Sequence, residues 1–440
     1  MFFWRKKKTQ PKETPTSPKQ EVAMDQLQTL LHSGIRENIE LALLMAESNH
    51  IKLDISTYVQ VYDWLRKWAF VQETATTNHE KAIVVLSLER LQMTSMGPVP
   101  LPKILGKISS LQELNIGHNN LETCPAFLPQ LAQLKTLDLS FNQLTQLPEF
   151  LIQNKNLRHL FLNSNQFQTI PNILYQLPQL ETIQIDNNPL KNIPSGWFEQ
   201  CKQLLELNLD QCDLHDLPLD ITRLIHLKEL YLNNNQLHEF PSTICALPNL
   251  EIISCNNNQI QKLSNHLGEL SQLKIARFEK NLLTQIPDSI QELQRLEALY
   301  LSYNRIDALP ESITNLTQLQ SLQLNSNRLQ QLPEAFGNLS QLKTLQITHN
   351  KLQKLPTSIG DCQQLEQLKL AYNDLLQLPS SIGQLRNLTQ LDLSGNQLKS
   401  LPKSIGQLSN LQTLQLKGNK FSPSILQQIQ QLLPNCQITT

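Results

Sequence analysis

The chain has 440 residues, of which 40% are hydrophobic, only 5% are aromatic and 12 are Gly. This length could form several ordinary domains, but a chain with so few aromatic residues must build its core mainly from aliphatic side chains. The formal net charge of -1 gives no reason to expect nucleic acid or an anionic surface as the main partner.

The first 20 residues predict a basic disordered tail. Residues 1–20 carry six basic side chains against one Glu, with three prolines, a composition that cannot bury a core. Phe2, Phe3 and Trp4 precede the basic run, which leaves open a weak contact of this tail with an anionic membrane surface. A secretory signal has basic residues before its apolar stretch, the opposite order, and no run is long enough to span a bilayer. We therefore expect a soluble cytoplasmic protein.

Residues 21–80 predict a helical N-terminal capping region. Three apolar series recur at helical spacing, and an array of repeats needs such a cap where its open end would otherwise be exposed. The series are Met24, Leu27, Leu30 and Leu31; Ile35, Ile39 and Leu43; and Tyr58, Val61, Leu65 and Trp68.

A 23-residue repeat fills most of the remaining chain. Residues 388–410, LTQLDLSGNQLKSLPKSIGQLSN, show its form, LxxLxLxxNxLxxLPxxIxxLxx, whose first Leu is called position 1 below. The step is 23 residues except after Leu180, where one extra residue falls near Trp197. A degenerate unit from Ile83 is expected to open the array, which places the solenoid at 81–421. The fourteen regular repeats start at Leu111, Leu134, Leu157, Leu180, Leu204, Leu227, Leu250, Leu273, Leu296, Leu319, Leu342, Leu365, Leu388 and Leu411.

This pattern resembles the leucine-rich repeat family, in particular its intracellular 23-residue LPxxI subclass, which includes plant Ras-group-related and animal scaffold proteins. The resemblance covers roughly three quarters of the chain and implies an α/β solenoid. Such a solenoid is a horseshoe with a parallel concave β-sheet and short helical or 3-10 convex segments. The resemblance also implies a protein-binding concave face, without naming the ligand.

Each position of the repeat has a physical role that suits this fold. Leucines at positions 4 and 6 lie two residues apart, so both point to one face of a short strand. The Asn at position 9 can pair backbone groups of the turn that would otherwise be buried without partners. The Pro at position 15 ends the extended segment and begins a short helical turn. Cys212 replaces this Asn once and Ser264 replaces this Pro once, so we expect a partial ladder and a less rigid turn there.

Residues 422–440 predict a C-terminal capping helix. Ser422 and Pro423 form a helix start, and the apolar residues that follow fall on one helix face, which can cover the last repeat. These apolar residues are Ile425, Ile429 and Leu432.

The seven cysteines favour reduced, buried thiols. Cys124, Cys255 and Cys362 stand where other repeats have Leu or Ile, so they fit as small core residues. The count is odd, and the chain has neither a CxxC pair nor a Cys/His cluster, which argues against disulfides and against a zinc site. We expect no metal and no cofactor.

Positions 3, 5, 7 and 8 point away from the leucines and form the concave face, which carries the variable residues. From Glu113 to Glu229 these positions hold six acidic residues and no basic residue. From Arg277 onward, basic residues outnumber acidic ones. We therefore expect an acidic first half and a mildly basic second half. Accidental charge clustering on a solvated surface is the alternative interpretation.

Six residues of the concave face form the candidate partner-binding site. The repeat does not require aromatic residues at these positions, and Tyr and Arg are enriched among the residues that dominate binding energy. The six residues are Tyr231, Arg277, Lys280, Tyr300, Tyr303 and Tyr372. The alternative is that these tyrosines only cover neighbouring side chains and bind nothing.

Two irregular units lie beside the centre of this site. The unit from Leu250 lacks its Pro, and the next unit has Ala276 and Phe278 in place of two strand leucines. A broken consensus next to an unusual surface can mark function. Ordinary drift of the repeat explains it nearly as well.

The sequence has no catalytic motif of the common kinds. A phosphate-binding GxxxxGK[ST] loop, an HExxH helix and the kinase signature set are all missing. We therefore expect a non-catalytic interaction module or scaffold that binds a protein partner, with no nucleic acid and no small-molecule substrate. One alternative is a regulator or effector that acts on a signalling enzyme such as a small GTPase. Another is a self-assembling structural protein.

Overall fold

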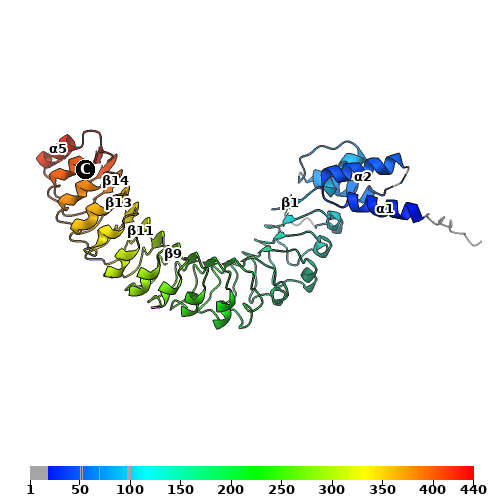
Figure 1. The fold of residues 1–440 in the computed structure, drawn as a ribbon, viewed down its shortest axis with the longest axis horizontal. Helices are drawn as coiled ribbons and strands as arrows, with labels where there is room; N and C mark the ends of the chain where they lie inside the picture. The colour runs from blue at the N-terminus through cyan, green and yellow to red at the C-terminus, as the bar shows by residue number, and fades with distance from the viewer. Residues whose placement is uncertain (1–17, 50, 52, 69, 97–100) are drawn as a thin grey trace, which may run out of the picture.

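The computed structural model describes residues 18–49, 51, 53–68, 70–96 and 101–440. These residues form a long arc, with a group of helices at one end and the C-terminal helix at the other (Figure 1). A single sheet of 16 parallel strands runs through the arc, and the strands lie in the order of the sequence. The expected α/β solenoid with a parallel concave sheet is therefore confirmed.

The strands are short because each repeat contributes only three residues to the sheet. Leu114 pairs with Leu137, and the same 23-residue register continues from strand to strand except at two pairs. The offset is 24 residues across the one-residue insertion, between β5 and β6, and between the last two strands, β15 and β16. In almost every strand the middle residue is buried and its neighbours are partly exposed, as expected for alternating side chains. The strands are β1 Arg90–Gln92, β2 Glu113–Asn115, β3 Thr136–Asp138, β4 His159–Phe161, β5 Thr182–Gln184, β6 Glu206–Asn208, β7 Glu229–Tyr231, β8 Ile252–Ser254, β9 Ile275–Arg277, β10 Ala298–Tyr300, β11 Ser321–Gln323, β12 Thr344–Gln346, β13 Gln367–Lys369, β14 Gln390–Asp392, β15 Thr413–Gln415 and β16 Gln437–Thr439.

The N-terminal region contains the three expected helices and a fourth that was not predicted. The helices are α1 Pro18–Leu31, α2 Arg36–Ser48, α3 Ser56–Lys67 and α4 Asn78–Leu86. Ile83 lies within α4, so the prediction that a degenerate repeat opens at Ile83 is wrong, and the first strand is β1. Thr77 and Glu80 form a capping box at the start of α4. This box stabilises a helix in a segment whose apolar spacing also matches the repeat.

The helices join the core of the repeats through α3 and α4. Val61 and Leu65 of α3 belong to the same buried cluster as the repeat leucines. Leu27, Ile39 and Leu86 belong to a second, smaller cluster shared by α1, α2 and α4. The predicted basic tail lies outside the described residues, apart from its last three residues, which begin α1.

Short 3-10 helices form the convex side of the arc, and Pro sets the start of most of them. The Pro at position 15 has φ between −60° and −78° and directly precedes the helical turn. The turns are η1 Lys103–Lys107, η2 Leu128–Gln130, η3 Glu149–Gln153, η4 Asn172–Gln176, η5 Leu219–Arg223, η6 Ser242–Ala246, η7 Leu267–Glu269, η8 Asp288–Glu292, η9 Glu311–Asn315, η10 Phe336–Asn338, η11 Thr357–Asp361, η12 Ser380–Gln384 and η13 Lys403–Gln407.

The unit with Ser264 closes its turn without Pro, as expected. The Ser264 hydroxyl accepts a hydrogen bond from the His266 backbone N–H at 3.1 Å, and its carbonyl accepts one from the Leu267 N–H at 3.1 Å. The resulting η7 is three residues long, whereas most turns have five. Units with Pro125 and Pro333 also have three-residue turns, η2 and η10, so the short turn is not a consequence of the missing Pro.

The Asn residues at position 9 form a continuous ladder along the inside of the arc. Asn258 is typical: its amide donates to the carbonyls of Leu232 and Cys255, and its oxygen accepts from the Leu237 N–H. Each Asn therefore pairs backbone groups of its own repeat and of the preceding one, as the sequence predicts. The hydrogen bonds of this ladder link neighbouring repeats, and because they are buried, water cannot replace them.

Cys212 makes only part of this ladder, as expected for a thiol. Its Sγ lies 3.5 Å from the carbonyl oxygen of Ile185 and 3.4 Å from that of Asp210. The Leu190 N–H, which would donate to an Asn in a regular unit, instead donates to the Asn188 carbonyl at 2.8 Å. The turn before the insertion is thus rearranged so that the Leu190 N–H keeps a partner.

A helix and an unexpected strand cap the C-terminal end. Helix α5 spans Pro423–Leu432, and the Ser422 hydroxyl accepts from the Ile425 N–H at its start, as predicted. Ile429 is buried, but Leu432 is exposed and Leu433 is buried in its place, so that part of the predicted apolar face is wrong. The chain leaves the helical conformation at Leu433, which turns this side chain inward, and β16 then pairs with β15.

All seven cysteines are buried and none forms a disulfide. Burial raises the pKa of Cys124, Cys201, Cys212 and Cys362 to about 12, because an apolar interior disfavours the thiolate. The prediction that the cysteines are buried core residues is confirmed. In the described part of the chain, no helix combines the length and the apolar character that crossing a bilayer requires.

Candidate functional site

The concave face consists of the side chains that leave the strands opposite the buried leucines. Residues at positions 3 and 5 alternate with a buried residue at position 4 in nearly every strand, so they line the inner face of the sheet. Residues at positions 7 and 8 follow directly and form the rim at the carboxyl ends of the strands. The six candidate residues divide between these two places: Tyr231, Arg277 and Tyr300 lie on the strands, and Lys280, Tyr303 and Tyr372 lie on the rim.

Arg277 and Tyr300 form the centre of the site. They occupy paired positions on β9 and β10, and the Arg277 guanidinium carbon lies 5.6 Å from the centre of the Tyr300 ring. Both side chains are partly exposed. Packing of a guanidinium against an aromatic ring leaves the N–H groups at its edge free for a carboxylate, and stabilises the pair by about 0.5–1 kcal/mol at exposed sites.

Tyr231 occupies position 5 of its repeat, as Arg277 does, and lies two strands away from it. Its hydroxyl donates to Oε2 of Glu229 at 2.5 Å, and the ring is half-buried. Burial, followed by the neighbouring carboxylates Glu229 and Glu206, raises the pKa of Tyr231 well above its ordinary value. Tyr231 is therefore a neutral donor held in one orientation, with its ring available to a partner.

Four carboxylates near Tyr231 have no cationic partner. They are Asp186, Glu206, Asp210 and Glu229, and no Lys, Arg or His of the described chain pairs with any of them. Burial raises the pKa of Asp186 to about 6, with a smaller contribution from the charge of Asp210, and burial also raises the pKa of Asp210. Oδ1 of Asp186 is buried without a hydrogen-bond partner. This part of the face therefore holds more negative charge than its own surroundings satisfy.

The three rim residues have an unusual backbone conformation. Every residue at position 8, from His118 to Gly418, has a positive φ, including Lys280 at 54°, Tyr303 at 60° and Tyr372 at 55°. This left-handed region disfavours side chains, and β-branched ones most, and none occurs at position 8. The three side chains are exposed, and their spacing follows the repeat.

Tyr372 lies apart from the other candidate residues. Its ring stacks on that of His349 with centroids 4.4 Å apart and planes 2° apart. A Cβ at Gly395 would lie 2.6 Å from Cδ1 of Tyr372, so the ring also lies over that glycine. Three repeats separate Tyr372 from Tyr303, about 14 Å along the sheet. The structure therefore packs Arg277 against Tyr300, whereas it pairs Tyr372 with His349, three repeats from Tyr303.

The irregular units beside the site have a packing explanation. Ala276 and Phe278 are both fully buried, and the Phe278 ring meets that of Phe240 edge to face, with centroids 5.5 Å apart. A small residue at position 4 is thus offset by a large one at position 6. The exchange of two strand leucines for Ala276 and Phe278 is therefore explained by how these side chains fill the core, and it adds no support for function at this place.

A shallow depression of about 470 Å³ lies on the concave face over β5 to β9. Acidic residues line one side of it and Arg277 lines the other. Its lining residues are Gln184, Glu206, Asn208, Asp210, Tyr231, Asn233, Ser254, Asn256 and Arg277. The depression is polar and open, which suits side chains of a macromolecular partner better than an enclosed small molecule.

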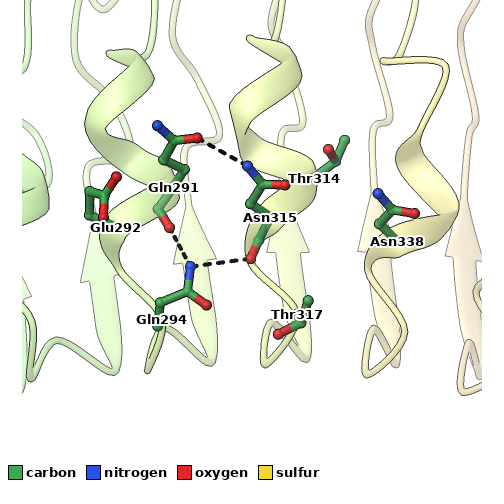
Figure 2. A pocket seen from close by; sticks show the side chains of 7 residues that line it. All are labelled: Gln291, Glu292, Gln294, Thr314, Asn315, Thr317 and Asn338. Atoms are coloured by element: carbon green, nitrogen blue, oxygen red, sulfur yellow. Dashed lines mark hydrogen bonds between the residues drawn. The ribbon is translucent and has the colours of Figure 1, made fainter.

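A second hollow of about 570 Å³ lies on the convex side, between η8 and η9 (Figure 2). Its amide groups mostly bond to one another: Asn315 Nδ2 donates to Oε1 of Gln291 at 3.0 Å, and Gln294 Nε2 donates to the Gln291 carbonyl at 2.5 Å. Figure 2 shows these three side chains converging between the two turns. This hollow is a junction between neighbouring repeats, and Glu292 is the one charged residue in its lining.

Metal-ligating side chains do not converge in the described residues. No group of three or more His, Cys, Asp or Glu among them could hold a metal ion. His118 stacks on Phe141 at 4.0 Å, and His349 stacks on Tyr372, so these imidazoles belong to ring pairs on the rim. What the face offers is charge, hydrogen-bonding groups and aromatic area.

Sequence reasoning missed a second polar ladder on the concave face. Asn233 Oδ1 accepts from the Asn256 N–H at 2.7 Å, and Asn256 Oδ1 accepts from the Glu279 N–H at 2.7 Å. Asp210 begins this series by accepting two bonds from Asn233. Runs of three asparagines at 233–235 and 256–258 were the available signal, because the repeat requires only the last one of each run.

Family models match the repeats along more than half of the chain. The model described as "Leucine rich repeat" matches residues 132–190, 155–214, 178–237, 271–329, 317–375 and 377–421. The model described as "Leucine Rich repeats (2 copies)" matches residues 109–152 and 225–268. A comparison with curated proteins finds no match.

Solved structures with the same architecture come from several kinds of protein. A leucine-rich repeat protein of Leptospira interrogans is 33% identical, with a TM-score of 0.78, over 84% of this chain and 94% of that one. The Arabidopsis receptor kinase HAESA, solved with the peptide hormone IDA and the co-receptor SERK1, is 29% identical, with a TM-score of 0.57, over 78% of this chain and 64% of that one. An internalin of Listeria monocytogenes shares the fold at 21% identity, with a TM-score of 0.59, over 82% of this chain and 94% of that one.

These matches agree with the geometry of the molecule. The parallel sheet, the Asn ladder and the Pro-initiated convex turns recur with the 23-residue period over the same residues that the family models match. Solenoids of this kind are generally protein-interaction modules and typically have no catalytic role. The chain belongs to the leucine-rich repeat family.

Proposed function

We propose that this protein is a non-catalytic interaction module or scaffold that binds a protein partner on its concave face. The observation that carries the proposal is the row formed by Tyr231, Arg277 and Tyr300 across β7, β9 and β10. Arg and Tyr dominate the binding energy of many interfaces, and here the Arg277 guanidinium is packed on a ring and has no carboxylate partner in the described chain. An ordered but unpaired side chain loses little entropy on binding.

Affinity capture from the native cell lysate, followed by mass spectrometry, tests this proposal. The variant Arg277→Ala/Tyr300→Ala/Tyr303→Ala removes the centre of the site while leaving every repeat leucine in place. The matched control is Gln294→Ala/Arg295→Ala/Asn315→Ala, three exposed substitutions on the convex side of the same two repeats. We expect a protein that the wild type and the control capture and the first variant loses. Identical protein sets from all three would contradict a concave binding site.

The compartment and the subclass belong to the same proposal. Seven free, buried cysteines support a reducing compartment, and we propose that the protein is cytoplasmic. The LPxxI pattern of the repeats supports membership of the intracellular 23-residue subclass. One of the similar structures is a plant receptor kinase bound to a peptide hormone. An extracellular location is therefore the alternative to the cytoplasm. Fractionation of the source cells with an antibody to the protein separates the two.

Two other functions remain as alternatives. A regulator or effector of a signalling enzyme, such as a small GTPase, would use the same concave face, and the captured partner would distinguish it from a scaffold. A self-assembling structural protein would form oligomers whose proportion rises with protein concentration, which sedimentation velocity measures. We propose neither a nucleic acid nor a small-molecule ligand, because the depression over β5 to β9 is open, polar and acidic on one side.

A further inference from the structure

The concave face has charges of opposite sign at a fixed separation, and these define the kind of partner that it fits. We call the segment from β6 to β10 the central strip, with Glu206, Asp210 and Glu229 at its acidic end and Arg277 and Tyr300 at its basic end. Glu206 and Asp210 of the acidic end and Arg277 of the basic end line the same depression. Neither end contacts the other, because β8 contributes the neutral Ser254 between them.

The acidic end lacks counter-charges, although its carboxylates are held in place. Gln184 Nε2 donates to Oε1 of Glu206 at 2.8 Å, the Tyr231 hydroxyl donates to Glu229, and Asn233 donates twice to Asp210. All three donors are neutral. Hydrogen bonds from neutral groups orient a carboxylate but do not cancel its charge. A cationic side chain of a partner is therefore attracted by all three carboxylates.

The basic end is held in place in the same way. Stacking on Tyr300 fixes the plane of the Arg277 guanidinium, and this group forms no ion pair in the described chain. Its edge can therefore bind a carboxylate through two parallel hydrogen bonds. Three strand steps separate β6 from β9, which is about 14 Å at about 4.8 Å for each step.

We propose that the central strip binds an extended segment of a partner protein that crosses the strands, with a Lys or Arg over Glu206 and Asp210 and an Asp or Glu about four residues away on Arg277. An extended chain advances about 3.3 Å for each residue, so four residues span the separation of the two ends. The proposal rests on the proposed function and specifies its chemistry. Polyanions do not fit, because the acidic end repels them.

Selection from a displayed library of random 12-residue peptides tests this inference directly. The wild type is compared with Glu206→Lys/Asp210→Lys, with Arg277→Glu, and with the control Glu149→Lys/Glu311→Lys. Glu149 and Glu311 are exposed at the starts of the convex turns η3 and η9, so the control adds the same charge away from the strip. Urea unfolding of each variant checks that it is folded.

The wild type and the control are expected to enrich peptides in which a basic and an acidic residue stand about four positions apart. Binding of these peptides to either strip variant should weaken about tenfold or more and should depend on salt. Peptides in which the basic residue is changed to Glu should regain binding to Glu206→Lys/Asp210→Lys. This exchange of charge is a result that a merely unfolded variant cannot produce.

Three outcomes would overturn the inference. The first is a set of selected peptides without the charge spacing, and the second is equal binding to the strip variants and the control. The third is a library that yields no binder, because the inference requires that a short extended segment suffices. Peptides that bind both strip variants as well as the control, but lose binding to Arg277→Ala/Tyr300→Ala/Tyr303→Ala, would leave the proposed function standing and reject this inference alone. Peptides that depend on no concave residue would contradict both.

Discussion

Asp186 is the residue at which burial and charge conflict most directly. Its Oδ1 is buried without a partner, and burial raises its pKa to about 6. A carboxyl group whose folded pKa is raised stabilises the fold below its unfolded pKa, and this contribution is lost as pH rises through the folded pKa. We therefore expect Asp186→Asn to raise the free energy of unfolding at pH 7.5 by about 1 to 2 kcal/mol, a figure reduced because solvent still reaches the side chain.

Urea unfolding of the wild type and Asp186→Asn at two pH values checks this prediction. The gain from the substitution should shrink at pH 4, where the wild-type carboxyl is protonated in the folded state. A gain of equal size at both values would mean that the Asn side chain stabilises by new hydrogen bonds and not by removal of charge.

The Asn ladder predicts a difference between two equivalent positions. Asn235 accepts from the N–H groups of Cys212 and Leu214 at 3.0 Å and donates to the Leu209 carbonyl at 2.8 Å. Asn235→Ala leaves these buried groups without partners and should cost about 2 to 4 kcal/mol of unfolding free energy. Cys212→Ala should cost only about 1 kcal/mol, because a thiol bonds weakly and the turn beside it is already rearranged.

Thermal or urea unfolding of the two variants measures this difference. Both substitutions are buried and lie in adjacent repeats, so each serves as the control for the other. Equal costs would show that the position matters for its packing volume and not for its hydrogen bonds.

Among the elements, the convex turns near the C-terminal end pack closely because of glycine. A Cβ at Gly360 would lie 2.5 Å from the backbone oxygen of Ser381 in the next turn, and one at Gly383 would lie 2.3 Å from that of Ser404. Backbone atoms cannot give way as flexible side chains can. The spacing between η11, η12 and η13 therefore depends on the absence of a side chain at this position.

Gly360→Ala should destabilise the protein by about 1 to 3 kcal/mol, because η11 and η12 must move apart. The matched control is Gly406→Ala in η13, where the nearest contact of a Cβ would be 3.3 Å, to the Leu432 oxygen, and the strain should be small. The midpoint of urea unfolding compares the two variants. A control as damaging as Gly360→Ala would attribute the effect to the turn conformation and not to the contact between turns.

At the scale of the whole molecule, stability depends on contacts between neighbours, so the ends decide how far unfolding spreads. Ile429, Leu433 and Cys436 are buried against the last repeats, and β16 pairs with β15. A chain that ends at Phe421 should lose about 3 to 6 kcal/mol of stability in this region, from the three side chains that no longer cover the core.

Hydrogen exchange followed by mass spectrometry tests this expectation for the shortened chain. Amides of β13 to β15 should exchange faster, while those of β3 to β6 should keep their protection. Faster exchange along the entire arc would mean that the repeats unfold as one cooperative unit.

Sequence periodicity alone determined the solenoid, because fourteen copies report the same environment independently. The Leu pattern, the Asn ladder and the Pro-initiated turns needed no tertiary information, since each follows from local geometry repeated at a fixed step. The side on which the candidate residues lie followed from the same alternation. Capping elements were less predictable, and α4 and β16 were missed, because each occurs once and has no second copy to support it.

Only the tertiary structure decided which candidate residues act together and how their charges are satisfied. The structure shows the Arg277 guanidinium against the Tyr300 ring and the Tyr372 ring stacked on His349. It also shows that Ala276 and Phe278 have a packing explanation, because the Phe278 ring meets that of Phe240. The sequence alone identifies which charged residues lie on the concave face. Whether Glu206, Asp210 and Arg277 find partners within the chain depends on distances between strands, which arise from the packing of the solenoid.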